Sequence, residues 1–228
     1  CACLVGSEMC IRDSYNWIQD NIKKVDKATN GKVGYIYIPD MGPEGLNEFS
    51  RYFYPQLDKE GLIIDDRANG GGNVSPMILE RLSREPYRLT MRRGSSLIGT
   101  VPDAVQVGPK VCLINKYSAS DGDLFPWGFR ALGLGKLIGT RTWGGIIGIS
   151  GPLPYMDGTD IRVPFFTSYD PKTGNWIIEN HGVDPDILID NDPIKEWNGE
   201  DQQLDRAIEE VMKLSLIHIS EPTRHAQI

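Results

Sequence analysis

The sequence contains no long apolar run and no cluster of basic residues. No segment approaches the roughly 18 consecutive apolar residues of a membrane span, although 40% of the 228 residues are hydrophobic. Lys and Arg never occur in runs longer than a pair, and the formal net charge is −7. We therefore expect no membrane-spanning segment, and neither nucleic acid nor a membrane surface as a partner.

Cysteine and histidine are scarce, with 4 and 3 residues, and most of them lie near the two ends of the chain. The stretches EMCIRDS (8–14) and LSLIHISEPTR (214–224) resemble the two translated ends of a sequencing adapter. We predict that 1–14 and 214–228 are read-through artefacts, the alternative for the first being a natural cysteine-rich leader. Only Cys112 and His181 then remain, so we expect no disulfide, no metal site and no cofactor.

Strand-like and helix-like segments alternate between these tails, which is typical of a single α/β domain. Apolar spacing predicts helices at 15–27, 42–57 (ending early at Pro55), 74–82, after Ser120, and at 201–213. Short apolar runs predict strands at 32–38, 61–65, 110–115 and 136–139, followed by shorter strands up to Trp176–Glu179. The last helix should bury Leu204, Ala207, Ile208 and Val211.

One unusual segment, DDRANGGGNVS (65–75), lies where a predicted strand ends and a helix begins. Ligands usually bind at such strand ends in α/β folds. Three consecutive glycines let backbone amides approach a ligand, because no side chain intrudes and a positive φ costs little. The segment lacks the Lys-Ser/Thr of a phosphate loop and the spacing of a dinucleotide fingerprint. A purely structural tight turn is an equally good interpretation of these residues.

A second unusual segment, NKYSASDGD (115–123), takes a predicted strand through two serines into a helix. A serine at this junction can lie at the helix N-terminus, where free amides and the positive end of the helix dipole would stabilise a developing oxyanion. The alternative is a serine that only caps the helix. From the residues alone the capping role is the better prediction.

Five ordered motifs carry a family resemblance that reverses this preference: GYIYIPD, DDRANGGGNVS, NKYSASDGDLFPWGFR, GTRTWGGIIGI and ENHGVDPDI. Together they resemble the catalytic domain of the tricorn and C-terminal processing peptidases, over nearly all of residues 15–213. The resemblance implies a mixed β-sheet flanked by helices, related to the ClpP/crotonase fold. It also implies that Ser120 is the nucleophile. The amide of Asp121 and one from Gly70 or Gly71 would form the oxyanion hole.

The catalytic base is the part of this pattern that the chain lacks. Many members of the family carry a lysine base in an aromatic-Gly-Lys element, and this chain has Gly145 at the lysine position. The resemblance therefore implies the tricorn arrangement, in which a histidine and a companion serine lie upstream, beyond a PDZ-like domain. Residues 15–31 would be a linker helix and 32–213 the catalytic domain. Glu179 falls at the position of the supporting glutamate, the alternative being an exposed strand-end acid, and His181 is expected to be a loop residue.

The function predicted from these residues is peptide-bond hydrolysis through an acyl-enzyme. The resemblance implies short peptides or unfolded chains as substrates and a homo-oligomer, a hexamer in tricorn. This chain alone should be nearly inactive because a serine without a base is a poor nucleophile. Two alternatives stay open, a crotonase-like acyl-CoA enzyme and a catalytically silent peptide-binding scaffold. The single cysteine outside the tails suits the cytoplasm and equally a disulfide-free exported (periplasmic) protein.

Simpler predictions apply to five further residues. Asp65 and Arg67 should brace the glycine turn by local hydrogen bonds. Asp66 replaces a residue that is usually apolar in the family. Asp123 either supports the start of the serine helix or is exposed there. Pro126 is best tolerated in a first helical turn, so the serine helix should begin late or be kinked.

Overall fold

The central sheet consists of five strands, each built from an almost continuous apolar run. The computed structural model describes residues 2–94, 98–149, 154–159 and 161–220, with side chains from 12 to 215. The strands lie in the order β1 (Val33–Tyr37), β2 (Gly61–Asp65), β5 (Lys110–Ile114), β6 (Gly135–Gly139) and β9 (Ile187–Leu188), and every pairing is parallel. Apolar runs of this kind form strands that are buried on both faces.

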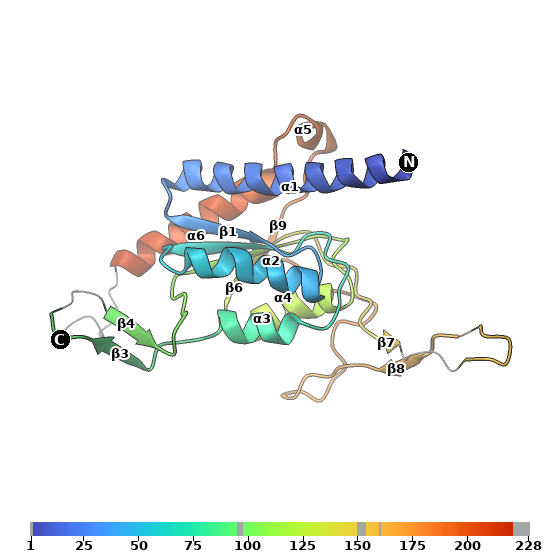
Figure 1. The fold of residues 1–228 in the computed structure, drawn as a ribbon. Coiled ribbons are helices and arrows are strands. Elements are labelled where there is room, and N and C mark those ends of the chain that lie inside the picture. Colours follow the sequence, from blue (N-terminus) through green and yellow to red (C-terminus); the bar gives the residue numbers. More distant parts are fainter. Residues whose placement is uncertain (1, 95–97, 150–153, 160, 221–228) are drawn as a thin grey trace.

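Helices cover both faces of this sheet (Figure 1). One face packs against α1 (Ala2–Thr29) and α6 (Gln202–Ser220), and the other against α2 (Pro43–Phe53), α3 (Ser75–Leu82) and α4 (Asp121–Ala131). Side chains alternate along a strand, so Tyr35 lies in the core beneath α1 and α6 while Ile36 lies in the core beneath α2 to α4. The short helices η1 (Tyr54–Gln56) and α5 (Pro193–Trp197) follow α2 and β9.

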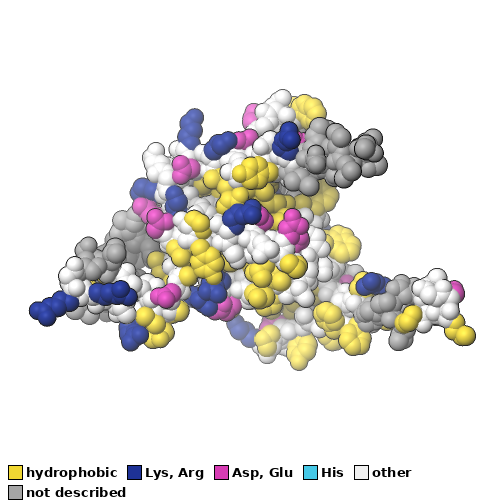
Figure 2. All heavy atoms as spheres, in the orientation of Figure 1, with side chains coloured by type: hydrophobic (Ala, Val, Ile, Leu, Met, Phe, Trp, Pro, Cys, Tyr) yellow, Lys and Arg dark blue, Asp and Glu magenta, His cyan; other side chains and the backbone are white. Residues whose placement is uncertain are grey.

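Two small antiparallel sheets project from opposite sides of the molecule (Figure 1). One pairs β3 (Arg88–Met91) with β4 (Ile98–Val101), and the other pairs β7 (Gly148–Ile149) with β8 (Pro164–Phe166). Both expose large apolar side chains (Figure 2). Among them, Met91 is 71% exposed and Phe165 is 76% exposed. The projecting sheets therefore contribute little to the core of the chain.

The predicted α/β class is confirmed, and the antiparallel strand pairs of the described residues are those of the two small sheets. The last helix buries the four apolar residues expected of it, Leu204, Ala207, Ile208 and Val211. Within the described residues, every helix is too short or too polar to traverse a bilayer. Helices α1 and α6 both continue into the tails, whose foreign origin stays a prediction.

Two local predictions were wrong. Trp176–Glu179 is not a strand, since Trp176 makes only an isolated bridge to Tyr169 and Glu179 lies in a turn. Helix α4 starts directly after Ser120 and includes Pro126 in its second turn, so the predicted late start is wrong, and the kink stays a prediction. The ring lacks one N–H, but Pro126 is buried against the core, and the packing of Phe125 and Phe129 on either side offsets that single lost bond.

Candidate active site

Ser120 lies at the junction between β5 and α4, where the resemblance placed a nucleophile. Its backbone has φ 57° and ψ −119°, and its side chain makes no capping hydrogen bond. A positive φ is unfavourable for a residue with a Cβ, and such strain is concentrated at functional sites. Ser120 is exposed, and no described side chain bonds to its hydroxyl. The simple capping role is therefore not what this serine does.

The glycine turn lies directly against this serine. The amide of Ala119 donates to the carbonyl of Asn69 at 2.8 Å, which joins the two loops through their backbones. Gly71 has φ 94°, and a Cβ added there would lie 2.7 Å from the Cβ of Ser120 and 2.9 Å from the nitrogen of Asp121. Only glycine allows this approach, so the glycine turn can pack against Ser120 because residue 71 has no side chain.

Of the three amides predicted for the oxyanion hole, those of Gly70, Gly71 and Asp121, two have no acceptor in the described part of the chain. The amide of Gly71 is occupied, because it donates to Oδ1 of Asn69 at 2.9 Å. The amides of Gly70 and of Asp121, the first residue of α4, have no such partner. A Cβ placed on Gly70 would meet no atom within 4 Å, so this position faces open space.

The carboxylate of Asp121 links the serine loop to the end of the glycine turn. Its Oδ1 accepts from the hydroxyl of Ser75 at 2.5 Å and its Oδ2 from the amide of Ser75 at 3.0 Å. Ser75 is the first residue of α3, so this pair holds the end of the glycine turn against the start of α4. Both side chains are buried, which strengthens the charge-assisted bonds.

Glu179 is half-buried and is held by backbone amides. Its Oε2 accepts from the amides of Ile146 at 2.7 Å and Ile147 at 3.0 Å. No described residue bonds to its Oε1. The carboxylate is thus fixed at one oxygen and available at the other, which an exposed strand-end acid would not be.

His181 pairs with a neighbouring carboxylate on the surface. Its Nε2 lies 2.7 Å from Oδ2 of Asp184, and both side chains are more than half exposed. The backbone of His181 packs against Gly144, where a Cβ would lie 2.8 Å from the His181 nitrogen. This agrees with the prediction that His181 is a loop residue.

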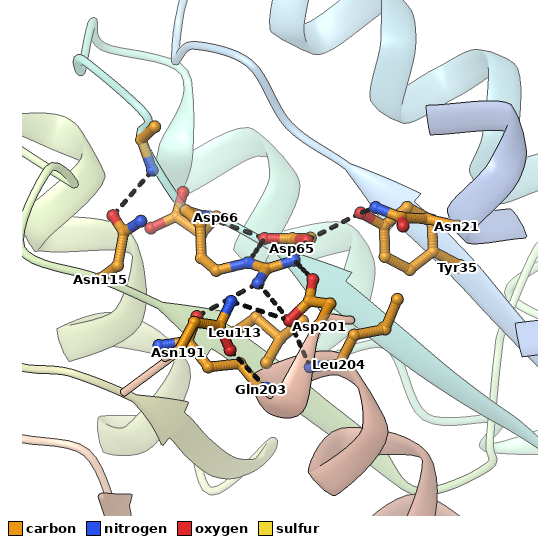
Figure 3. Close-up of polar contacts among 12 residues, drawn as sticks. Asn21, Tyr35, Asp65, Asp66, Leu113, Asn115, Asn191, Asp201, Gln203 and Leu204 are labelled. Carbon is orange, nitrogen blue, oxygen red and sulfur yellow. Dashed lines mark hydrogen bonds and ion pairs between the residues drawn. The ribbon is translucent and has the colours of Figure 1, made fainter. Parts of the chain in front are cut away.

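A buried ion-pair network braces the strand end that precedes the glycine turn (Figure 3). Arg67 donates to both oxygens of Asp65, at 2.9 Å and 2.6 Å, and also to Asp201 and Gln203 at the start of α6. Tyr35 donates to Asp65 at 2.7 Å, and burial raises the pKa of Tyr35 well above its usual value. The bracing role predicted for Asp65 and Arg67 takes the form of an ion pair that also anchors α6.

Asp66 is completely buried, and neither of its carboxyl oxygens has a hydrogen-bond partner in the described part of the chain. Burial raises the pKa of Asp66 well above its ordinary value, and the charges of Asp65, Asp121 and Asp123 raise it further. A buried carboxyl in this position is held neutral. These carboxyls do not gather into a metal site, since no described group of three His, Cys, Asp or Glu side chains could hold an ion.

Sequence reasoning left the surroundings of Asp123 open and assigned no role to Ser118 or Asn69. Asp123 is fully buried, so its predicted exposed alternative is wrong. Ser118 is also buried and donates to the backbone oxygen of Asp66 at 2.8 Å. Asn69 precedes the glycines, and an Asn-Gly pair is a signal for the side-chain turn that it forms. The partners of Asp123 and Ser118 lie far away in the sequence and gave no such signal.

An exposed, strained serine at a helix start, beside a glycine turn with a free amide, is the arrangement used by serine hydrolases that form acyl-enzymes. The chain belongs to Peptidase family S41, whose profile matches residues 32–189.

Its relatives include the tricorn protease of Thermoplasma volcanium, 44% identical over 196 residues that cover 86% of this chain and 19% of the relative. Tricorn protease homolog 1 of Streptomyces coelicolor is 38% identical over 192 residues, covering 84% of this chain and 18% of the relative. A crystal structure titled as the tricorn protease superposes with a TM-score of 0.81 at 40% identity, over 88% of this chain and 19% of that one. The chain therefore spans about a fifth of the length of the proteins that it resembles.

Proposed function

We propose that the protein containing this chain is a tricorn-type serine peptidase that cleaves short peptides or unfolded chains through an acyl-enzyme on Ser120. The observation that supports it most strongly is the serine itself, exposed and strained at the start of α4 and in close contact with the glycine turn. The names of the relatives, tricorn proteases, support the same reaction.

In this mechanism the hydroxyl oxygen of Ser120 attacks the carbonyl carbon of the scissile peptide bond while the base takes the hydroxyl proton. The negative oxygen of the tetrahedral intermediate accepts bonds from the amides of Gly70 and Asp121. We favour Gly70 over Gly71 because the Gly71 amide already donates to Asn69. The C–N bond then breaks, the amine leaves with a proton from the base, and water hydrolyses the ester by the same route.

The base in this proposal is a histidine supplied by a segment outside the chain, with a companion serine. Glu179 would orient that histidine and stabilise its charged form, as the carboxylate of a triad does. Its Oε1, which has no partner among the described residues, suits this role, since Oε2 is held by Ile146 and Ile147. His181 does not fit, because its ring pairs with Asp184.

We infer a homo-oligomer, a hexamer by analogy with the tricorn family, in the cytoplasm, with the periplasm as the alternative compartment. The exposed apolar side chains of the two projecting sheets, such as Leu89 and Phe166, are consistent with burial in an assembly. Sedimentation of the complete gene product tests the oligomer, and a monomer at micromolar concentration would contradict it.

Hydrolysis of a fluorogenic peptide by the complete gene product tests the peptidase. We expect activity that Ser120→Ala lowers by at least about 10⁴-fold in kcat, and the 228-residue chain alone should have little. The crotonase-like alternative has no need of a strained serine, and it predicts that Ser120→Ala leaves thioester chemistry intact. Peptide binding without any turnover would instead indicate a silent scaffold.

A further inference from the structure

Five consecutive backbone amides, those of residues 143–147, all donate to groups of the active site. We call this stretch the bridge segment. The amide of Trp143 donates to the carbonyl of Ser118 at 3.0 Å. The amides of Gly144 and Gly145 donate to the two oxygens of Asp123, at 2.7 Å and 3.3 Å. The next two amides donate to Glu179. The bridge segment therefore runs from the serine loop to the glutamate.

Asp123 is the only side chain of α4 shown bonding to the bridge segment within the described residues. It is the third residue of the helix, and its own amide donates to the carbonyl of Ser120 at 2.9 Å. An acidic side chain in a first turn usually stabilises the helix dipole from the surface. Asp123 is instead fully buried, with both oxygens bound to the bridge. Burial raises the pKa of Asp123, while bonds from Thr142, Gly144 and Gly145 oppose that rise.

The far end of the bridge is packed just as tightly against the residues that follow Glu179. Gly144 has φ 89°, and a Cβ there would lie 2.3 Å from the nitrogen of Gly182. The amide of Asn180 donates to the carbonyl of Gly144 at 2.7 Å, and Asn180 has a positive φ of 61°. A shift of Gly144 must therefore shift Asn180, and with it the neighbouring Glu179.

We propose that Asp123 is a positioning residue that acts through the bridge segment to hold the carboxylate of Glu179 in a fixed position relative to Ser120. This rests on the catalytic roles proposed for Ser120 and Glu179. Asp123 touches no reacting atom. It fixes the bridge at its centre, so that the Ile146 and Ile147 amides point at Oε2 and leave Oε1 for the base.

The first test needs no catalysis and uses the chain as it is. Asp123→Asn keeps the size of the side chain but replaces one acceptor oxygen by an NH₂ group, which cannot accept from a glycine amide. Hydrogen exchange should then become about 10-fold faster or more at the Ile146 and Ile147 amides, which Asp123 does not contact. The matched control is Asp170→Asn, because Asp170 also accepts from a loop amide, that of Lys172 at 2.8 Å. Unchanged exchange at Ile146 and Ile147 would overturn the proposal.

The second test separates positioning from general loosening of the fold, in the complete gene product. Asp123→Asn should lower kcat about 10-fold to 100-fold with KM within about 2-fold. If Asp123 acts through Glu179, the same change should have almost no further effect in a Glu179→Gln background. Two effects that multiply would overturn the proposal. A wild-type protein that hydrolyses no peptide would instead refute the proposed function, and the exchange result would still decide the coupling.

Discussion

Asp66 gives the sharpest prediction about stability, because its carboxyl is buried without a hydrogen-bond partner in the described part of the chain. Burial first, and the neighbouring Asp65 second, raise its pKa well above the ordinary value. In the unfolded chain the pKa of an aspartate is about 3.9. Between these two pKa values the folded protein holds a proton that the unfolded chain releases. The free energy of unfolding therefore falls as pH rises, by about 1.4 kcal/mol per pH unit.

Asp66→Asn removes this titration while keeping the size of the side chain. Across any two pH units between the unfolded and folded pKa values, the wild type should lose about 2.7 kcal/mol relative to the variant. Urea unfolding of both proteins at pH 4.5, 5.5 and 6.5 measures this difference, in which the contributions of other groups cancel. A flat difference for Asp66→Asn, or one of opposite sign, would refute a neutral buried carboxyl.

Three further substitutions test the geometry. Gly70→Pro removes the proposed oxyanion donor and should lower kcat about 10²-fold to 10³-fold. Gly70→Ala keeps the amide and should retain most of the rate. Equal rates for the two variants would exclude the Gly70 amide as an oxyanion donor. Gly71→Ala places a methyl group 2.7 Å from the Cβ of Ser120, so fluorophosphonate labelling should slow at least about 10-fold, and an unchanged rate would contradict the close approach. Asp201→Ala removes one partner of Arg67 and should lower the free energy of unfolding by about 1–3 kcal/mol, as measured by urea denaturation; no change would show that the pair is not formed.

The sequence predicted the elements whose signals are local. β2 has the predicted bounds because an apolar run between Gly61 and Asp65 is bounded by polar residues on both sides. The close approach of the glycine turn and Ser120 could also be expected, since the carboxyl ends of neighbouring parallel strands lie at one edge of a sheet. The pairing of β2 with β5 provides that proximity.

Features that depend on distant contacts could not be predicted. Asp123 has the same local sequence context whether it faces solvent or a loop 21 residues later, and only the fold brings Gly144 to it. The β3–β4 hairpin was missed because Arg88–Met91 is short and exposed along its whole length, so no buried apolar run marks it. Trp176–Glu179 has an apolar pattern, but the Ile177 amide donates to Ser168 and the Glu179 amide donates back to Ile177, so the backbone turns there instead of continuing as a strand.

Covalent labelling of the complete gene product with a fluorophosphonate, followed by mass spectrometry of its peptides, tests the central claim most directly. The account predicts a single phosphonyl group on the oxygen of Ser120, and its loss when Ser120 is changed to Ala. Peptide hydrolysis by a protein in which this serine stays unlabelled, or in which another residue carries the label, would contradict it.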